Sequence, residues 1–220
     1  MQTDRNYQFY GDAAQRYDGI VSKADYSLPR LVYDHVVARR EVKDAEVLDI
    51  GIGTGLSSIA FAEAGARVTG IDASAEMLAE CERKAFTRTL KRHDLTLGLL
   101  PAFTTSFDIV VCLGIYEFVH QPSAFLQSVH DIMRPEALFV LAIRDACLND
   151  WISIMPFHDL LIDARAFRDH GMVAAHHDYS HTVALLRELA FEIVLEEDVF
   201  AYRSPTQDAD TLNRLVIAQR

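Results

Sequence analysis

The sequence predicts an α/β fold in which helices cover both faces of a mostly parallel sheet. Short strand-like runs alternate with helical stretches through the middle of the chain, which is typical of parallel strands joined by crossover helices. The run FDIVVCL at 107–113 is continuous and rich in β-branched residues, as expected of a strand buried on both faces. The other strands expected here are residues 46–50, 67–71 and 138–143, with helices at 56–63, 75–85 and 122–133.

The two ends of the chain depart from this alternation. Residues 1–40 are expected to form an N-terminal helical cap, and residues 144–180 show no clear period. A helix is expected near 182–189, followed by strands near 191–196 and 212–218. Because no helix separates these last two strands, they should form an antiparallel hairpin at one edge of the sheet. Residues 1–220 are interpreted as a single domain, long enough to bury a sizeable core.

The charge of the chain disfavours a nucleic-acid partner. The formal net charge is −11, whereas proteins that bind nucleic acids hold the phosphates mainly with basic side chains. Five basic residues lie close together in the sequence, and we interpret this stretch as a solvated helix and the turn after it. Its members are Arg83, Lys84, Arg88, Lys91 and Arg92.

The cysteines and the apolar runs indicate the compartment. Cys81, Cys112 and Cys147 are widely spaced and odd in number, so they predict neither a disulfide framework nor a thiolate metal site. The first residues, MQTDRNYQFYGD, lack the apolar stretch of a signal peptide, and no apolar run is long enough to span a bilayer. We therefore expect a cytoplasmic protein without a membrane partner.

The strongest motif is the glycine-rich turn VLDIGIGTG at 47–55, between an expected strand and an expected helix. Gly51, Gly53 and Gly55 let the backbone turn tightly with no Cβ in the way of a ligand. The following helix presents free N–H groups and the positive end of its dipole to whatever lies in the turn. The carboxyl end of a central strand is also where open α/β sheets bind ligands.

An acidic residue at the end of the next strand makes an adenosine ligand the best interpretation of this turn. Asp72, in GIDAS, can accept hydrogen bonds from both ribose hydroxyls of an adenosine. NAD would fit the same spacing, but a dinucleotide turn has its third glycine at the sixth motif position, which is Leu56 here. The pattern GxGxG therefore disfavours a pyrophosphate.

These residues carry a resemblance to a known family. VLDIGIGTG, VTGIDASAEML, FDIVV and YEFV, between about residues 45 and 143, closely resemble the class I S-adenosylmethionine (SAM)-dependent methyltransferases, in which cysteine is more usual at Ile52. FYGDAAQRYDGIV, SLPRL and RKAFTRTLKRHDL are similar to a small-molecule subgroup that includes the methyltransferase-like 27 proteins. The resemblance implies a Rossmann-like fold, with a mostly parallel seven-stranded sheet and an antiparallel C-terminal hairpin.

The resemblance also implies which residues hold the cofactor. Asp49 would face the methionyl end of SAM, the three glycines would approach its carboxypropyl group and ribose, and Asp72 would hold the ribose diol. Asp94 would accept from the adenine amine. The remaining expected contacts are Ala73, Met77 and Leu95 beside adenine, and Leu113 and Gly114 near the sulfonium and methyl. Met77 fits ordinary core packing equally well, and Asp94 could be a plain loop residue.

The acceptor side is less defined, and no catalytic residue is assigned. Methyl transfer needs close, aligned reactants and a dry pocket, and a general base only where the acceptor must lose a proton. The candidates are Tyr17, which in the resembling enzymes folds over the cofactor, Tyr116 after the fourth strand, and His181 in the histidine-rich HHDYSH. Residues 144–180 are where this fold builds its acceptor pocket. His177 and His181 could share a zinc ion, but no third ligand stands nearby, so no metal site is predicted.

Three functions remain open at this stage. The favoured one is a methyltransferase, acting as a monomer or homodimer, that converts SAM to S-adenosylhomocysteine and methylates oxygen or carbon of a small molecule. The turn LGIYEF at 113–118 lacks the Asn/Asp-Pro-Pro-aromatic pattern of enzymes that methylate nucleobase amino groups. A non-catalytic SAM-binding module would have the same turn, and an NAD-type oxidoreductase is disfavoured by Leu56.

Overall fold

The structure, a computed structural model, describes residues 3–95, 98–144, 177–204 and 209–220. Its helices are α1 Thr3–Lys23, α2 Leu28–Val37, α3 Ile59–Glu63, α4 Ala75–Arg83, α5 Pro122–Ile132 and α8 Tyr179–Glu188, with a 3-10 turn η1 at Tyr116–Phe118. Its strands are β1 Glu46–Ile50, β2 Arg67–Asp72, β3 Thr89–Arg92, β4 Phe107–Cys112, β5 Met133–Ile143, β6 Glu192–Ser204 and β7 Ala209–Gln219.

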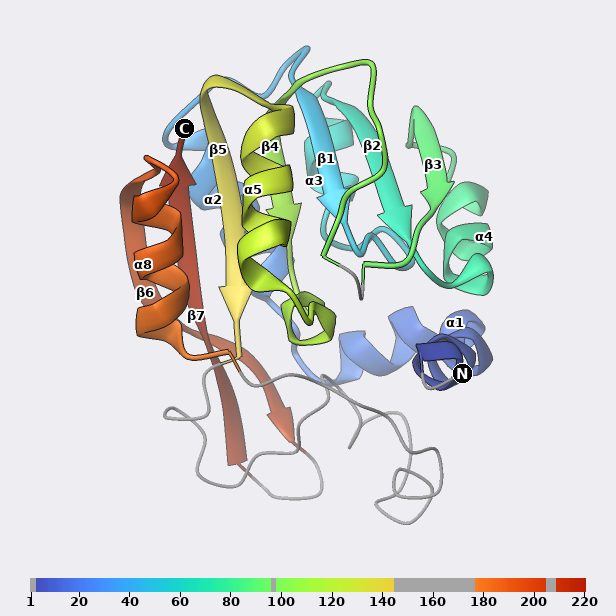
Figure 1. Cartoon of the computed structure of the whole chain (residues 1–220). Helices are drawn as coiled ribbons and strands as arrows, with labels where there is room; N and C mark the ends of the chain where they lie inside the picture. Colours follow the sequence, from blue (N-terminus) through green and yellow to red (C-terminus); the bar gives the residue numbers. More distant parts are fainter. Residues whose placement is uncertain (1–2, 96–97, 145–176, 205–208) are drawn as a thin grey trace.

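The strands form one seven-stranded sheet in the order β3-β2-β1-β4-β5-β7-β6 (Figure 1). The pairs β1–β2, β1–β4, β2–β3 and β4–β5 are parallel. Strand β7 is antiparallel to both β5 and β6. The expected mostly parallel sheet with an antiparallel C-terminal hairpin is therefore confirmed.

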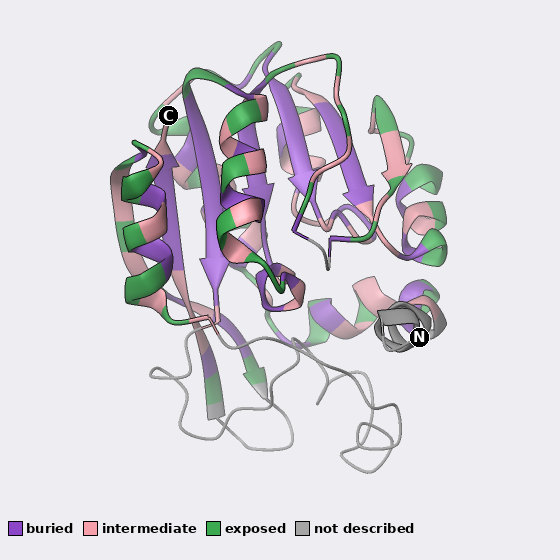
Figure 2. Ribbon diagram, viewed as in Figure 1, coloured by how far each residue is buried: buried purple, intermediate pink, exposed green. Residues whose placement is uncertain are grey.

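Helices cover both faces of the sheet, as predicted (Figure 1). Alternate residues of each central strand point to opposite faces: in β1, Leu48 belongs to the apolar cluster beneath α5 and α8, and Val47 to the cluster beneath α2 and α3. Every residue of β1 is buried, and the central strands lie within the protein over most of their length (Figure 2). This rigid core fixes the ends of the strands, where the candidate site lies.

The segment after α4 differs from the predicted solvated helix and turn, because a short strand, β3, follows the turn. Strand β3 was not predicted: TLKR has a single apolar residue, and an edge strand of four residues carries little periodic signal. The basic side chains around it contact the protein itself. Arg83 pairs with Glu80, Arg88 with Glu46 and Lys84 with Asp18, while Lys91 and Arg92 donate to the backbone oxygens of Ala102 and Ala73.

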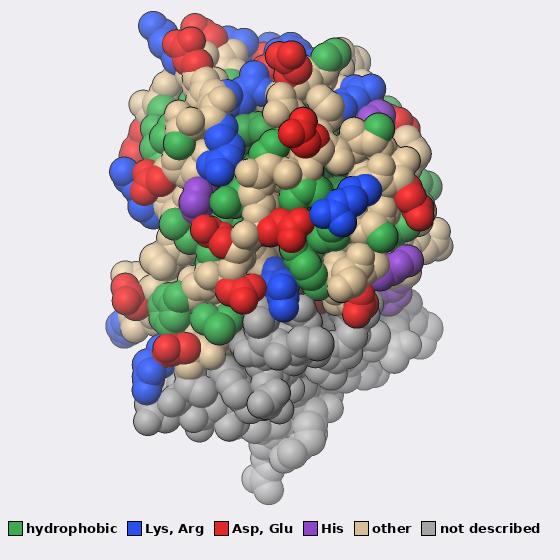
Figure 3. Space-filling view, turned by 90° about the vertical axis from the view of Figure 1, so that its left-hand side faces the viewer, with side chains coloured by type: hydrophobic (Ala, Val, Ile, Leu, Met, Phe, Trp, Pro, Cys, Tyr) green, Lys and Arg blue, Asp and Glu red, His purple; other side chains and the backbone are tan. Residues whose placement is uncertain are grey.

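Strand β6 forms the edge of the sheet opposite β3, and its exposed Glu192, Glu196 and Asp198 place charges along this edge. Such charges hinder pairing with another edge strand. The face of the molecule that carries this edge shows acidic and basic side chains interspersed (Figure 3). In the described part of the chain, no helix is both long and apolar enough to cross a bilayer.

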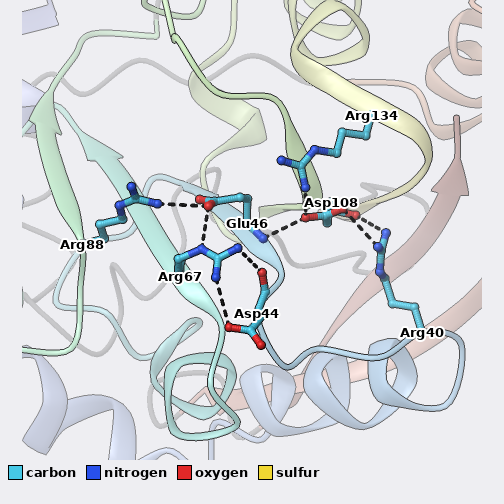
Figure 4. Close-up of polar contacts among 7 residues, drawn as sticks. All are labelled: Arg40, Asp44, Glu46, Arg67, Arg88, Asp108 and Arg134. Atoms are coloured by element: carbon cyan, nitrogen blue, oxygen red, sulfur yellow. Dashed lines mark hydrogen bonds and ion pairs between the residues drawn. The ribbon is translucent and has the colours of Figure 1, made fainter.

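Ion pairs join the strands at the amino end of the sheet (Figure 4). Asp108 in β4 accepts from Arg40 at 3.2 Å, from Arg134 at 2.5 Å and from the Glu46 backbone N–H at 2.9 Å. Glu46 in turn accepts from Arg67 at 2.6 Å. Burial alone would raise the pKa of Asp108, but these donors and positive charges lower it overall. The cluster lies at the opposite end of the strands from the glycine turn, so we interpret it as structural.

Asp108→Asn should therefore destabilise the fold by about 2 kcal/mol, because hydrogen bonds to a mostly buried charged group are lost. The pKa of Asp108 is lowered on folding, so its contribution is present above the unfolded-state pKa and is lost as the pH falls. Urea unfolding of the wild type and the variant at neutral and acid pH measures both effects. Asp44→Asn is the control, because its pair with Arg67 is exposed and should contribute little. Equal stability of Asp108→Asn and wild type would contradict the structural role.

Candidate functional site

The glycine turn follows β1 at the carboxyl edge of the sheet, between the ends of β2 and β4. Crossovers leave β1 and β4 in opposite directions, which makes this the point where α/β sheets bind ligands. The backbone N–H groups of Gly51 and Ile52 both donate to the carbonyl of Ile71, at 2.8 and 3.0 Å. These two bonds hold the start of the turn against the end of β2.

The three glycines of the turn have different surroundings, although all have positive φ. A Cβ on Gly51 would lie 2.3 Å from the Ile115 side chain, and a Cβ on Gly55 would lie 2.5 Å from the ring of Phe86. A Cβ on Gly53 would meet nothing closer than the Gly51 carbonyl oxygen at 4.0 Å. Gly51 and Gly55 thus allow close packing within the protein, whereas the space beside Gly53 is open.

Asp72 ends β2 and points at this turn. One carboxylate oxygen accepts from the backbone N–H of Gly53 at 2.9 Å, and the other accepts from the N–H of Ser74 at 2.8 Å. Burial raises the pKa of Asp72, although these backbone donors partly oppose the shift. A carboxylate has about four acceptor sites, so these backbone donors leave capacity for a ligand. The carboxylate therefore lies against the open part of the turn, as the ribose role requires.

Asp49 lies beneath the same turn and is only 1% exposed. Its Oδ2 accepts from the hydroxyls of Ser57 at 2.5 Å and Ser58 at 2.6 Å, while its Oδ1 has no hydrogen-bond partner. Burial raises the pKa of Asp49 to about 6, despite the two serine hydrogen bonds. Leaving such an oxygen without a partner is costly, so this atom fits a site for a cationic or hydrogen-bond-donating ligand.

If Asp49 faces a cationic amine, ligand affinity should fall as the pH decreases through about 6, because protonation removes the negative charge. For folding the sign is opposite: a raised pKa means that the folded protein binds this proton more tightly, so stability falls as the pH rises from 3.8 to about 6. Calorimetric titration with S-adenosylhomocysteine between pH 5 and 8 checks the first effect. Asp49→Asn should bind about tenfold or more weakly at neutral pH and lose most of the pH dependence. An unchanged pH profile in this variant would contradict the role.

The residues expected beside adenine occupy the β2–β3 side of the same edge. Ala73 is half-buried, and Met77 is buried in the first turn of α4, where its N–H donates to the Ser74 hydroxyl at 3.2 Å. Asp94 follows β3 and is exposed, while Leu95 is buried in the main core cluster. The backbone N–H of the intervening His93 donates to the carbonyl of Asp72 at 2.8 Å. Asp94 thus lies in a segment tied to the end of β2.

Helix α1 closes this edge of the sheet and is linked to the turn through Asp18 (Figure 1). Thr54 donates to Asp18 at 2.5 Å, and the Lys84 ammonium contacts Asp18 at 2.6 Å and the Thr54 carbonyl at 2.7 Å. Tyr17, the neighbouring residue, is half-buried against an apolar cluster of α1 and β6. Sequence reasoning missed the Asp18 contacts, because they join residues from three separate segments.

A small, partly open pocket lies beyond Leu113 and Gly114, at the carboxyl ends of β4 and β5. We call it the Arg144 pocket. Among the described residues, apart from the chain neighbours of Gly114, no atom lies within 4 Å of its Cβ position, whereas Leu113 is buried in the core. The residues that line the pocket are Tyr26, Gly114, Glu117, Ala142, Arg144, Ala201, Tyr202 and Asn213.

The other two catalytic candidates lie away from this pocket. Tyr116 is buried in the core, where its hydroxyl lies 3.3 Å from that of Thr182 and its ring is tilted by 37° from the His177 ring, with the centroids 4.3 Å apart. Its burial raises the pKa to about 12. His181 is exposed in the first turn of α8, where its N–H donates to Asp178. Glu117, the neighbour of Tyr116, lines the pocket instead.

Most of the expected acceptor segment, 144–180, lies outside the described residues, as do the histidines at 158 and 176. Within the described residues, no group of three or more histidine, cysteine or acidic side chains is arranged to hold a metal ion. The described cysteines, Cys81 and Cys112, are free and buried. The site therefore consists of the glycine turn, the two aspartates and the adjoining Arg144 pocket.

The strand order, the reversed last strand and the turn at the carboxyl edge together define the Rossmann-like methyltransferase fold. Residues 48–141 match the family model of the methyltransferase domain. The chain is 32% identical over 117 residues to a ubiquinone biosynthesis O-methyltransferase of Haemophilus ducreyi, with 50% of each protein covered. It thus spans about half the length of the curated relatives that it matches.

Solved structures show the same fold. The magnesium protoporphyrin IX methyltransferase of Synechocystis PCC 6803, solved with bound S-adenosylhomocysteine, superposes with a TM-score of 0.64 at 21% identity, over 99% of this chain and 93% of that one. An S-adenosylmethionine-dependent methyltransferase of Mesorhizobium loti gives a TM-score of 0.63 at 24% identity, over 82% of this chain and 93% of the other. At these identities the likeness concerns the fold.

Proposed function

We propose that this protein is a SAM-dependent methyltransferase that transfers a methyl group to a small molecule, with oxygen as the favoured acceptor atom. The observation that carries the proposal is the arrangement of Asp72 and Asp49 about Gly53. One carboxylate lies against the open part of the turn, and the other has a buried oxygen without a partner. The matched methyltransferase domain and the O-methyltransferase relatives support the same function.

The residues present fit this cofactor. Asp72 would accept from the ribose hydroxyls, and Oδ1 of Asp49 would face the ammonium of the methionyl group. Gly53 would leave room for the carboxypropyl chain, with Gly51 and Gly55 shaping the turn. The adenine would lie among Ala73, Met77, Asp94 and Leu95, and Leu113 and Gly114 would flank the sulfonium. Tyr17 on α1 would help to exclude water.

When bound, SAM supplies a methyl group activated by its sulfonium. This methyl group would pass to an acceptor oxygen, with the electron pair of the C–S bond left on sulfur and the acceptor proton released. The protein contributes alignment of the two reactants and exclusion of water. Asp72 and Asp49 would fix the cofactor, and the adjoining pocket would hold the acceptor beside Gly114.

The narrower assignments belong to this proposal as well. We assign the chain to the subgroup that includes the methyltransferase-like 27 proteins, on the stretches FYGDAAQRYDGIV, SLPRL and RKAFTRTLKRHDL. Its acidic net charge of −11 favours a small-molecule rather than a nucleic-acid acceptor. We further propose a cytoplasmic monomer or homodimer, consisting of one domain with residues 1–40 as a cap and 144–180 as the acceptor insertion.

Two measurements test the proposal. Thermal unfolding with SAM, S-adenosylhomocysteine and NAD should show a rise in Tm with the first two, because a ligand that binds only the folded state stabilises it. A shift with NAD alone would favour an oxidoreductase instead. Transfer of tritium from methyl-labelled SAM into a metabolite extract would demonstrate catalysis. Binding without transfer would favour a SAM-binding module.

A further inference from the structure

The guanidinium of Arg144 is only partly satisfied by its contacts within the described part of the chain. It follows directly after β5, where its Nη2 donates to the Tyr202 hydroxyl at 3.0 Å. Its Nε and Nη1 atoms are buried and have no hydrogen-bond partner. Among the described residues, no carboxylate forms an ion pair with it. Two buried guanidinium nitrogens without a hydrogen-bond partner are costly for the fold, so a ligand that accepts from them would be favoured.

The geometry of the guanidinium indicates which ligand. A carboxylate can bind to either of two edges, Nε with Nη2 or Nη1 with Nη2, and both oxygens then accept in parallel. Each edge of Arg144 contains one of the two unsatisfied nitrogens. An incoming carboxylate would therefore satisfy at least one of them on whichever edge it bound.

Glu117 is an acidic residue that lines the same pocket, and no ion pair joins it to Arg144. Glu117 is only 7% exposed, and its burial raises its pKa although the charge of Arg144 lowers it in part. A carboxyl held closer to its neutral form neutralises Arg144 less. Burial raises the pKa of Tyr26, which lines the same pocket, and the charges of Asp49 and Glu117 raise it further. A ligand with two negative charges, such as phosphate, would be repelled by these acidic groups more than a single carboxylate.

We propose that Arg144 binds a carboxylate of the methyl acceptor, so that the substrate is a small organic acid. This inference rests on the methyltransferase function proposed above. Arg144 and Gly114 both line this pocket, and Gly114 would flank the reacting methyl. Arg144 would then be a specificity-determining residue for the acceptor.

Calorimetry with a matched pair of probes tests this assignment. We would titrate 3,4-dihydroxybenzoate and its uncharged methyl ester into the full chain saturated with S-adenosylhomocysteine. The acid should bind about tenfold or more tightly than the ester, as expected for a buried charge-assisted pair. Arg144→Gln should remove this preference without weakening the ester. Arg203→Gln is the control, since that arginine lies on β6 of the C-terminal hairpin, is exposed and is paired with Asp210.

A second measurement needs no acceptor. Because Arg144 forms no ion pair among the described residues and two of its buried nitrogens have no partner, Arg144→Gln should leave the Tm of the free protein unchanged or raise it. A lower Tm would show that Arg144 supports the fold, and would overturn the proposal. The carboxylate proposal would also be overturned if wild-type protein bound S-adenosylhomocysteine but bound the acid and the ester equally. That result would leave the methyltransferase function intact. Failure to bind S-adenosylhomocysteine would instead contradict the proposed function itself.

Discussion

Asp72→Ala should reduce the affinity for S-adenosylhomocysteine by about two orders of magnitude, because two hydrogen bonds from the ribose to a charged acceptor are lost. The structure adds a second reason, since Asp72 also accepts from the N–H of Gly53 and thereby holds the turn in place. Asp72→Asn separates the two effects. It keeps one carbonyl acceptor for the turn but removes the charge, so its affinity should lie between those of wild type and Asp72→Ala.

Calorimetric titration measures these affinities, and circular dichroism with a thermal scan establishes that each variant is folded. Asp34→Asn is a suitable control: this aspartate is exposed on α2, where it pairs only with Arg30 of the same helix. It changes the net charge by the same amount as the Asp72 variants and should bind the ligand as wild type does. A folded Asp72→Ala protein with an unchanged dissociation constant would show that this carboxylate does not contact the ribose.

The fold was largely predictable because its signals are local. Runs such as FDIVVCL are apolar over their whole length only when both faces of a strand are covered, and this alone indicates a central strand. The absence of a helix between β6 and β7 was enough to predict the hairpin. Strand β3 was not predicted, because its residues are mostly polar and its only partner in the described sheet is β2. The first residues of β5, from Met133, were not predicted as strand, because Pro135 and Glu136 interrupt the apolar pattern.

The cofactor side of the site could be anticipated from the sequence for the same reason. A strand, a glycine turn and a carboxylate at the end of the next strand lie within 26 residues, from Val47 to Asp72, and parallel topology brings them together. What the sequence could not distinguish was the role of each glycine. Gly51 and Gly55 face Ile115 and Phe86, which are distant in sequence, and only the three-dimensional contacts separate them from Gly53.

The Arg144 pocket is assembled from residues that no local pattern connects. Tyr26, Glu117, Arg144 and Tyr202 come from four different parts of the chain and meet only when β6 and β7 complete the sheet. One signal was available: Arg144 directly follows a predicted buried strand, where a charged residue lies at the ligand-binding edge of the sheet. The same rule drew attention to Tyr116, but η1 turns that side chain into the core and places Glu117 at the pocket.

Gly53→Val should abolish detectable cofactor binding while the protein still folds. Its Cβ would enter space that holds no protein atom closer than 4.0 Å, and a branched side chain there would occupy the position proposed for the carboxypropyl chain of SAM. Gly53 has a φ of +53°, so the substitution also adds backbone strain of about 1–2 kcal/mol. A lower Tm is therefore expected in addition to the lost affinity.

Gly65→Val is the control that separates the backbone strain of Gly53→Val from its obstruction of the cofactor position. Gly65 has a φ of +91°, and a Cβ there would lie 3.4 Å from the flexible Lys43 side chain, in the connection that leads into β2 at the far end of the sheet. It should lose a similar amount of stability and still bind S-adenosylhomocysteine as wild type does. Gly55→Val should behave differently again, because its side chain would collide with Phe86 and Cys81 and prevent correct folding. Wild-type affinity in a folded Gly53→Val protein would mean that the open side of the turn is not where the cofactor lies.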